Sequence, residues 1–206
     1  MIYLQVGTVI KGADIEEGED DPVFAVASIL PLSLFSDSAK LKQLTTSLLS
    51  NCDADTTSDI DKILSCPDTA FLLNAKFNNL PLQITAQLYK ALKMELITER
   101  RENNSYKVRN LVLLTKSFQE PEQGRKVKRS KHATPSVQYE GADLSILSEI
   151  ATHSFSWKVT DETLAPMDTT KRAEEVSQGY RTVLVVPTDR FLKSVDKIEE
   201  TLSSET

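Results

Sequence analysis

Apolar and polar residues alternate along two segments of the chain, and this spacing predicts β-strands with one buried face. Residues 2–11 and 154–159 show the alternation most clearly. Short apolar runs predict four further strands, at residues 23–29, 70–73, 111–118 and 180–186. We expect the last of these to pair with residues 154–159.

Apolar residues at steps of three and four predict five helices. They cover residues 41–52, 55–64, 81–98, 141–151 and 188–202. The third helix is the longest, and its apolar face is expected to include Leu88, Leu92 and residues 94–96. The expected start signals are Asp37 or Ser38 as cap of the first helix, Pro81 in the first turn of the third, and Thr188 as cap of the last.

The order of these elements predicts the fold class. Strands and helices do not follow a strict βαβ repeat, so we expect an α+β fold with a mixed, mainly antiparallel sheet and helices packed on it. With 206 residues, 40% of them hydrophobic, residues 1–206 suit a single domain. The longest weakly polar stretch, residues 24–35, is too short to cross a bilayer. A secretory leader begins with a positively charged region, and no Lys or Arg precedes Lys11, so we expect no such leader.

Motifs for catalysis, cofactors or metals are missing from the sequence. Gly7 and Gly12 have the spacing of a phosphate-binding loop, but an acidic segment follows where Lys and Ser or Thr would be needed. No Gly-x-Ser-x-Gly motif marks a nucleophile. We expect no enzyme, no cofactor and no metal site.

The two cysteines and two histidines are too few and too scattered for a metal centre. Cys52 and Cys66 are expected to be packing residues rather than a disulfide scaffold. His132 and His153 have no partner at helical spacing, so we expect each to be solvated or to lie at the edge of the core.

Charge is concentrated in two segments of opposite sign, within a formal net charge of −6. The acidic loop, residues 12–22, carries six acids and no base: Asp14, Glu16, Glu17, Glu19, Asp20 and Asp21. The basic loop, residues 119–135, carries five bases: Arg125, Lys126, Lys128, Arg129 and Lys131. The acidic loop fits either a solvated excursion or an interaction element. The basic loop fits a nuclear localisation signal, a phosphate-contacting patch or a solubilising loop.

Four short motifs occur in a fixed order along the chain. Residues 71–84 read FLLNAKFNNLPLQI, GTVIK at 7–11 precedes the acidic loop, LLTKSF at 113–118 precedes the basic loop, and RTVLVVP at 181–187 precedes the last helix. In this order they resemble the BCCIP family over essentially the whole chain. The motif residues are Phe77, Asn79, Leu80, Pro81 and Gln83. Their alternative interpretation is architectural, with Phe77 filling the core, Asn79 closing a loop and Pro81 starting a helix.

Four residues depart from the family's pattern: Ala75, Lys76, Asn78 and Leu82. Ala75 and Leu82 stand where members have Glu and Pro. The family also usually begins earlier, with an acidic tail, a strand and helices. The resemblance therefore implies that this N-terminal part is lacking and that residues 2–10 lie at or near a sheet edge. An unpaired edge strand is an aggregation liability.

The resemblance to the BCCIP family implies a fold similar to the GCN5-related acetyltransferases, although their glycine-rich coenzyme A loop is missing here. Family members are nuclear proteins named for binding a breast-cancer recombination mediator and a cyclin-dependent kinase inhibitor. The fungal member is a chaperone of a large-subunit ribosomal protein and assists export of a lipid kinase. Animal members act in cell-cycle regulation, DNA repair and mitotic spindle organisation.

We therefore expect a non-enzymatic protein of the nucleus, with a cytoplasmic pool, that acts as chaperone or adaptor for a basic client such as a ribosomal protein. The acidic loop would attract the client and the basic loop would direct import. The recombination mediator and the kinase inhibitor are further expected partners. The alternatives are an acetyltransferase-like enzyme of the same fold and a nucleic-acid-binding protein that uses the basic loop. A pI of about 5.1 argues against the nucleic-acid-binding alternative.

Overall fold

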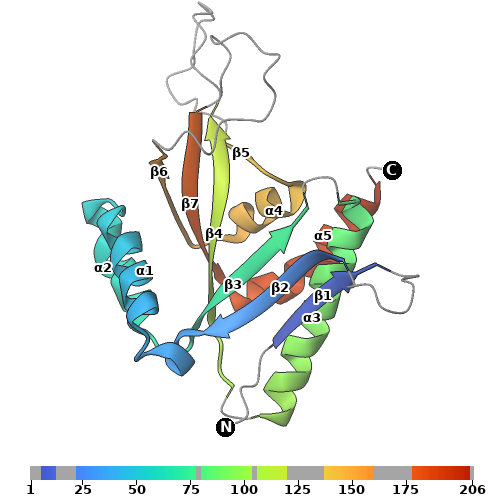
Figure 1. Ribbon diagram of the computed structural model, residues 1–206, viewed down its shortest axis with the longest axis horizontal. Coiled ribbons are helices and arrows are strands. Elements are labelled where there is room, and N and C mark those ends of the chain that lie inside the picture. Colours follow the sequence, from blue (N-terminus) through green and yellow to red (C-terminus); the bar gives the residue numbers. More distant parts are fainter. Residues whose placement is uncertain are drawn as a thin grey trace, which may run out of the picture.

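A seven-stranded mixed sheet organises the chain (Figure 1). The computed structural model describes residues 6–12, 22–77, 80–103, 106–119, 137–159 and 178–204. Its strands are β1 (Val6–Lys11), β2 (Val23–Pro31), β3 (Thr69–Lys76), β4 (Asn110–Gln119), β5 (Val137–Tyr139), β6 (His153–Lys158) and β7 (Gln178–Pro187). The order is β1-β2-β3-β4-β7-β6, with β5 on β4, and every pairing is antiparallel except that of β3 with β4. This confirms the predicted α+β fold.

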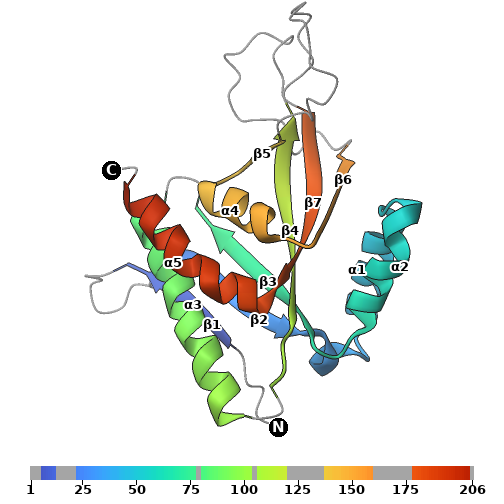
Figure 2. The ribbon, with the colours of Figure 1, turned by 180° about the vertical axis from the view of Figure 1, so that it is seen from behind.

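Helices cover the two faces of the sheet unequally. The helical elements are a 3-10 turn η1 (Leu32–Phe35), α1 (Ala39–Ser50), α2 (Ala54–Ser65), α3 (Leu82–Glu102), α4 (Ala142–Ile150) and α5 (Thr188–Ser204). Helices α3, α4 and α5 lie together on one face, which we call the covered face (Figure 2). Helices α1 and α2 pack on one part of the opposite face, which we call the open face (Figure 1).

The main core lies between the covered face and its three helices. It is built from alternate residues of the strands and from one stripe of each helix. In α3, Leu88, Leu92 and Leu96 recur every fourth residue and are fully buried. Met94, which we predicted to lie on the same apolar face, is 58% exposed. The grouping was wrong because a residue two positions from Leu92 lies on the other side of a helix.

The start signals of the helices agree with the structure only in part. Ser38 caps α1, since its Oγ accepts a hydrogen bond from the Leu41 N–H at 3.4 Å. Pro81 is the N-cap of α3 and precedes the first turn rather than lying in it. Thr188 is the first residue of α5, and its buried hydroxyl has no hydrogen-bond partner among the described residues. Its predicted capping role was therefore wrong. The backbone N–H of Thr188 instead donates a hydrogen bond to the Arg109 carbonyl at 2.8 Å.

The predicted edge strand is confirmed, because β1 ends the strand order of the described sheet. One of its backbone donors is occupied from outside the sheet. The N–H of Gly7 donates to the Glu95 carboxylate of α3 at 2.7 Å. A charged side chain against an edge strand disfavours pairing with another chain there.

We expect Leu88→Ala to lower the free energy of unfolding by about 2–5 kcal/mol, because it leaves a cavity under the sheet. Met94→Ala, on the exposed side of the same helix, should change it by about 0.5 kcal/mol or less. Urea unfolding followed by circular dichroism measures both. Equal losses in the two variants would contradict the assigned orientation of α3.

Candidate functional site

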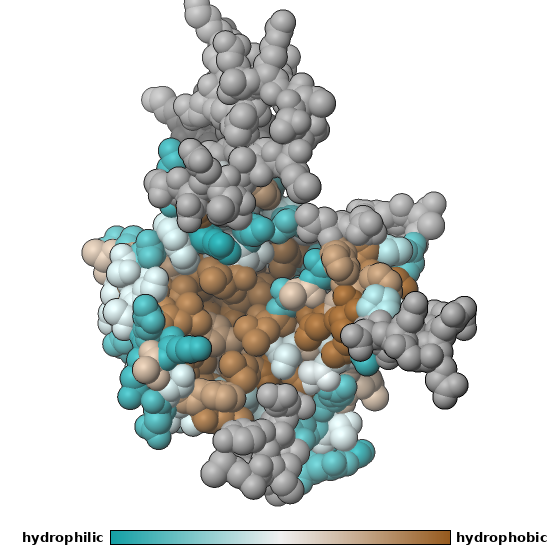
Figure 3. Space-filling view, in the orientation of Figure 1, coloured by the Kyte–Doolittle hydropathy of each residue, from teal (hydrophilic) through white to brown (hydrophobic). Residues whose placement is uncertain are grey.

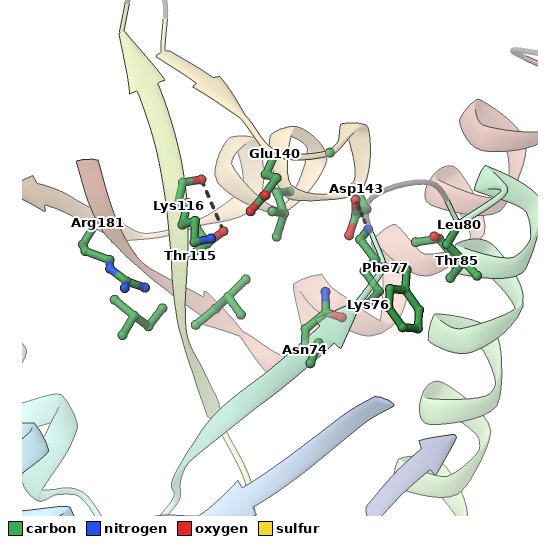
Figure 4. Close-up of a pocket in the computed structure, with 15 residues that line it drawn as sticks. Asn74, Lys76, Phe77, Leu80, Thr85, Thr115, Lys116, Glu140, Asp143 and Arg181 are labelled. Atoms are coloured by element: carbon green, nitrogen blue, oxygen red, sulfur yellow. Dashed lines mark hydrogen bonds and ion pairs between the residues drawn. The ribbon is translucent and has the colours of Figure 1, made fainter. Parts of the chain in front are cut away.

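A slot opens in the sheet between β3 and β4 (Figure 4). The two parallel strands pair only where Thr69–Phe71 meets Asn110–Val112. Farther along, β5 occupies the edge of β4 at Ser117–Gln119, the edge that faces away from β7. Between these two pairings, the four β4 residues 113–116 have no strand partner on that edge within the described ranges.

The slot holds a cavity of about 380 Å³. Its side walls come from residues 74–76 of β3 with the following Phe77, and from residues 113–116 of β4. Thr85 of α3 and Leu144 of α4 line it from the covered side, and Arg181 of β7 lines it from the open face. Five elements, β3, α3, β4, α4 and β7, therefore meet around one opening.

Exposed apolar side chains surround the mouth of the slot (Figure 3). Phe77 is 56% exposed, and its ring makes an edge contact with Phe24, at 6.1 Å between centroids. Leu73 and Leu114 are also exposed on this face. We call these four residues the apolar patch. It stays uncovered because α1 and α2 pack elsewhere on the open face, over Phe71, Val112 and Val185 among others.

The family motif lies at the connection from β3 to α3. The structure brings Phe77 and Leu80 to the same cavity. Pro81 starts α3, as the architectural interpretation expected, and Gln83 is half-buried in the first turn. The expectation that Phe77 fills the core was wrong, because it follows the last residue of β3 and faces solvent beside Phe24. Asn79 lies outside the described residues.

A buried polar network holds the elements around the slot. The Lys76 Nζ donates to Asp143 Oδ1 at 2.7 Å, and the Tyr89 hydroxyl donates to Asp143 Oδ2 at 3.0 Å. The Asn74 amide in turn donates to the Tyr89 hydroxyl at 2.7 Å. Burial, and then the Asp143 carboxylate, raise the pKa of Tyr89 well above its ordinary value, so the hydroxyl remains a neutral donor. The network joins β3, α3 and α4.

Two cations lie side by side on the β4 wall of the slot, on its open side. Lys116 of β4 lies directly opposite Arg181 of β7, whose other cross-strand neighbour is Trp157. Both cations are half-buried, and neither forms an ion pair with any residue in the described ranges. Glu140 also lines the cavity. Like charges directly opposite each other in a sheet are unfavourable, so this pair suits a bound anion.

The acidic loop leaves the fold beside the apolar patch. The Gly12 N–H donates to the Pro22 carbonyl at 3.2 Å, which brings the two ends of the loop together. A side-chain carbon placed on Gly12 would lie 3.4 Å from the ring of Phe24. The six acids themselves lie outside the described residues.

The basic loop leaves the fold at the far end of β4. Its two ends are brought together by the pairing of Gln119 with Val137. The five bases and His132 lie outside the described residues. Strand β5, which receives the chain after this loop, was not predicted, because three residues are too few to show a period.

Metal clusters, disulfides and membrane-spanning helices are absent from the described parts of the chain. These parts contain no group of three His, Cys, Asp or Glu residues placed to hold a metal ion. Cys52 and Cys66 are free thiols. Cys52 lies in the connection between α1 and α2 and packs, partly buried, against the core beneath these helices, in agreement with its expected packing role. His153 is the first residue of β6. None of the described helices is both long and apolar enough to traverse a bilayer.

We expect Asp143→Asn to lower the free energy of unfolding by about 3 kcal/mol or more, because it leaves the largely buried Lys76 without its counter-charge. Glu149→Gln is the matched control, since it breaks an exposed ion pair with Lys197 that is worth about 0–1 kcal/mol. Chemical denaturation of both variants measures the difference. A loss of less than 1 kcal/mol for Asp143→Asn would contradict the structural role of the network.

Comparisons with known proteins identify relatives of this chain. A family model described as BCCIP matches residues 3–157. The protein BCCIP homolog of Xenopus laevis is 28% identical over 214 residues, which cover 96% of this chain and 68% of that protein. The BRCA2 and CDKN1A-interacting protein of Bos taurus is also 28% identical, with 96% and 69% covered.

One solved structure shares the fold. The crystal structure of BCP1 from Saccharomyces cerevisiae matches with a TM-score of 0.59 and 13% sequence identity, over 95% of this chain and 68% of that one. The match supports the mixed sheet with helices packed on it. Since the family model covers most of the chain, and the curated relatives match along nearly all of it, this chain belongs to the BCCIP family.

Proposed function

We propose that this chain is a non-enzymatic protein-binding protein, a chaperone or adaptor for a basic client such as a large-subunit ribosomal protein. The observation that carries the proposal is the position of the acidic loop, which leaves the fold directly beside the exposed apolar patch. Apolar surface and negative charge side by side suit a client that is basic and carries apolar anchors. The names of curated relatives, which describe interaction with BRCA2 and CDKN1A, support a binding role.

The two parts of this surface contribute differently to binding. Large exposed aromatic side chains supply affinity when a partner covers them, as hot-spot residues do at protein interfaces. Phe24 and Phe77 are the candidates here, because they contact each other and are exposed together. Six acids in a short loop act mainly on the rate of encounter, since long-range attraction steers an oppositely charged partner.

A basic ribosomal protein also needs protection before it is assembled. Its positive surface binds nucleic acid of any sequence through phosphate contacts. A carrier with a net charge of −6 and a concentrated acidic loop would compete with those contacts until the client is handed over. The proposal extends to the nucleus, with import directed by the basic loop, and to roles in cell-cycle regulation, DNA repair and the mitotic spindle.

Neutralising the acidic loop should slow capture of the client. We expect replacement of its six acids by Asn and Gln to reduce the association rate with a purified basic ribosomal protein by about tenfold at low salt. The effect should shrink as salt is added. Stopped-flow fluorescence measures the rate.

The control variant for this experiment has the same net charge as the loop variant. It neutralises six exposed acids elsewhere: Asp37, Asp55, Asp59, Asp61, Asp196 and Glu200. If position beside the apolar patch matters, this variant should associate faster than the loop variant. Equal rates for the two variants would show that net charge alone acts, and an unchanged rate in the loop variant would remove the acidic loop from the proposal.

Nuclear import is tested through the basic loop. We expect Lys126→Ala, Lys128→Ala and Arg129→Ala together to shift a fluorescent fusion from nucleus to cytoplasm, because an import signal is read through its clustered positive charge. The fusion should be made too large to diffuse through nuclear pores. Exposed lysines Lys40, Lys42 and Lys193, changed to Ala, serve as control. Continued nuclear enrichment of the loop variant would exclude this import role.

A further inference from the structure

We propose that the slot between β3 and β4 binds an extended, acidic segment of a partner protein, which pairs as a short strand with the free edge of β4. The inference rests on the proposed function only in that the chain binds proteins, and it does not depend on the acidic loop. Three independent features of the described residues support it: a free strand edge, an unpaired cation pair and an apolar border.

The first feature is the free edge of β4. Residues 113–116 lie between the pairing with β3 and the pairing with β5, and they have no strand partner on this edge within the described ranges. At about 3.3 Å per residue this gap is roughly 13 Å long. Unpaired strand edges are templates for an added strand, so the gap suits a segment of about four residues.

The slot has this shape because β5 is short. Tyr139 is its last residue on the edge of β4, and the chain then turns away at Gly141 to begin α4. An added strand would pair with the same edge of β4 as β5 does, directly beyond the end of β5. On the opposite wall, the side-chain oxygen of Asn74 is buried and accepts no hydrogen bond from the described residues. It offers an acceptor to an incoming donor (Figure 4).

The second feature assigns the charge of the occupant. Lys116 and Arg181 lie opposite each other on the open side, half-buried and without an ion pair among the residues described. The Lys76–Asp143 pair is internally neutral, so the other charged lining residues, Lys116, Arg181 and Glu140, leave an excess of one positive charge. A carboxylate of the occupant that contacts both cations from the open side would reduce their mutual repulsion.

The third feature favours a peptide over a small anion. Side chains of an added strand alternate between the two faces of the sheet. Those on the open side would meet Phe77 and Leu114 beside the cations, and those on the covered side would meet Thr85 and Leu144. This arrangement fits acidic and apolar residues that alternate with small ones.

The probe for this site is a phage-displayed library of random dodecapeptides, selected on the purified full chain. We expect enriched peptides with at least one Asp or Glu among alternating apolar residues. Lys116→Glu with Arg181→Glu should weaken binding of a synthetic selected peptide at least tenfold. Glu140→Gln should strengthen it, because among the described lining residues Glu140 is the acid that has no ion-pair partner. The control is Lys40→Glu with Lys193→Glu, which changes exposed cations elsewhere and should alter the affinity less than twofold.

Two further measurements test strand pairing itself. Methylating alternate backbone nitrogens of the peptide removes its donors and should abolish binding, while its side chains are unchanged. Peptide binding should also slow hydrogen exchange of the backbone amides at residues 113–116. Only the alternate amides that point away from β7 report on the free edge, whatever the sequence of the peptide, and the amides that point toward β7 serve as an internal control.

Several outcomes would overturn the inference. The first is that no selected peptide depends on Lys116 and Arg181 for its affinity. The second is that the methylated peptide binds as tightly as the unmethylated one, and the third is that the peptide protects only amides outside the slot. The fourth is that self-association protects the slot in the absence of peptide. The last would make a second copy the occupant. Displacement of the peptide by acetate or sulfate at millimolar concentration would indicate a site for small anions instead.

The inference and the proposed function fail in distinguishable ways. If the basic ribosomal protein binds in a salt-dependent manner while no slot-dependent peptide is selected, only the slot proposal falls. If slot-dependent peptides bind while the six-acid loop variant captures the client at the normal rate, the slot survives and the steering role falls.

Discussion

The buried carboxylate of Asp143 is the contact on which the arrangement around the slot depends. A carboxylate without water must be paired, and the available partners are Lys76 at the end of β3 and Tyr89 in the middle of α3. These contacts tie the end of β3 to the helices of the covered face. Strand β4 instead continues along β7 through ten paired residues. The two parallel strands therefore diverge, and the sheet opens at its centre.

Much of the fold could be predicted from the sequence because it depends on local periodicity. The strands at residues 23–29 and 111–118, and the helix faces with Leu48 or Leu92, follow directly from the spacing of apolar residues. The failures have local causes too. Strand β5 is too short to show a period, and Thr188 was taken for a cap although the helix already includes it. The residues next to Thr188 in the sequence did not decide whether it is the N-cap or the first residue of the helix.

The candidate site was only partly predictable, because its contacts join distant residues. Phe77 and Leu80 were found through the family motif, and they do line the cavity. Nothing local indicated that Lys76 pairs with a residue 67 positions away, or that Lys116 would lie opposite Arg181. Cross-strand neighbours of this kind follow from sheet order, which hydrophobic patterns do not determine. The six acids and five bases, which dominate the sequence, remain predictions because they lie outside the described residues.

The boundaries of the slot have a consequence for how this sheet could grow. At β1, one of the two outer edges of the described sheet, Glu95 occupies the Gly7 donor, and an added strand there would itself present a new edge. The gap in β4 is different, because β5 limits it at one end and the β3 pairing at the other. Once filled, it presents no further template. An opening inside a sheet is thus saturable, with one strand per molecule.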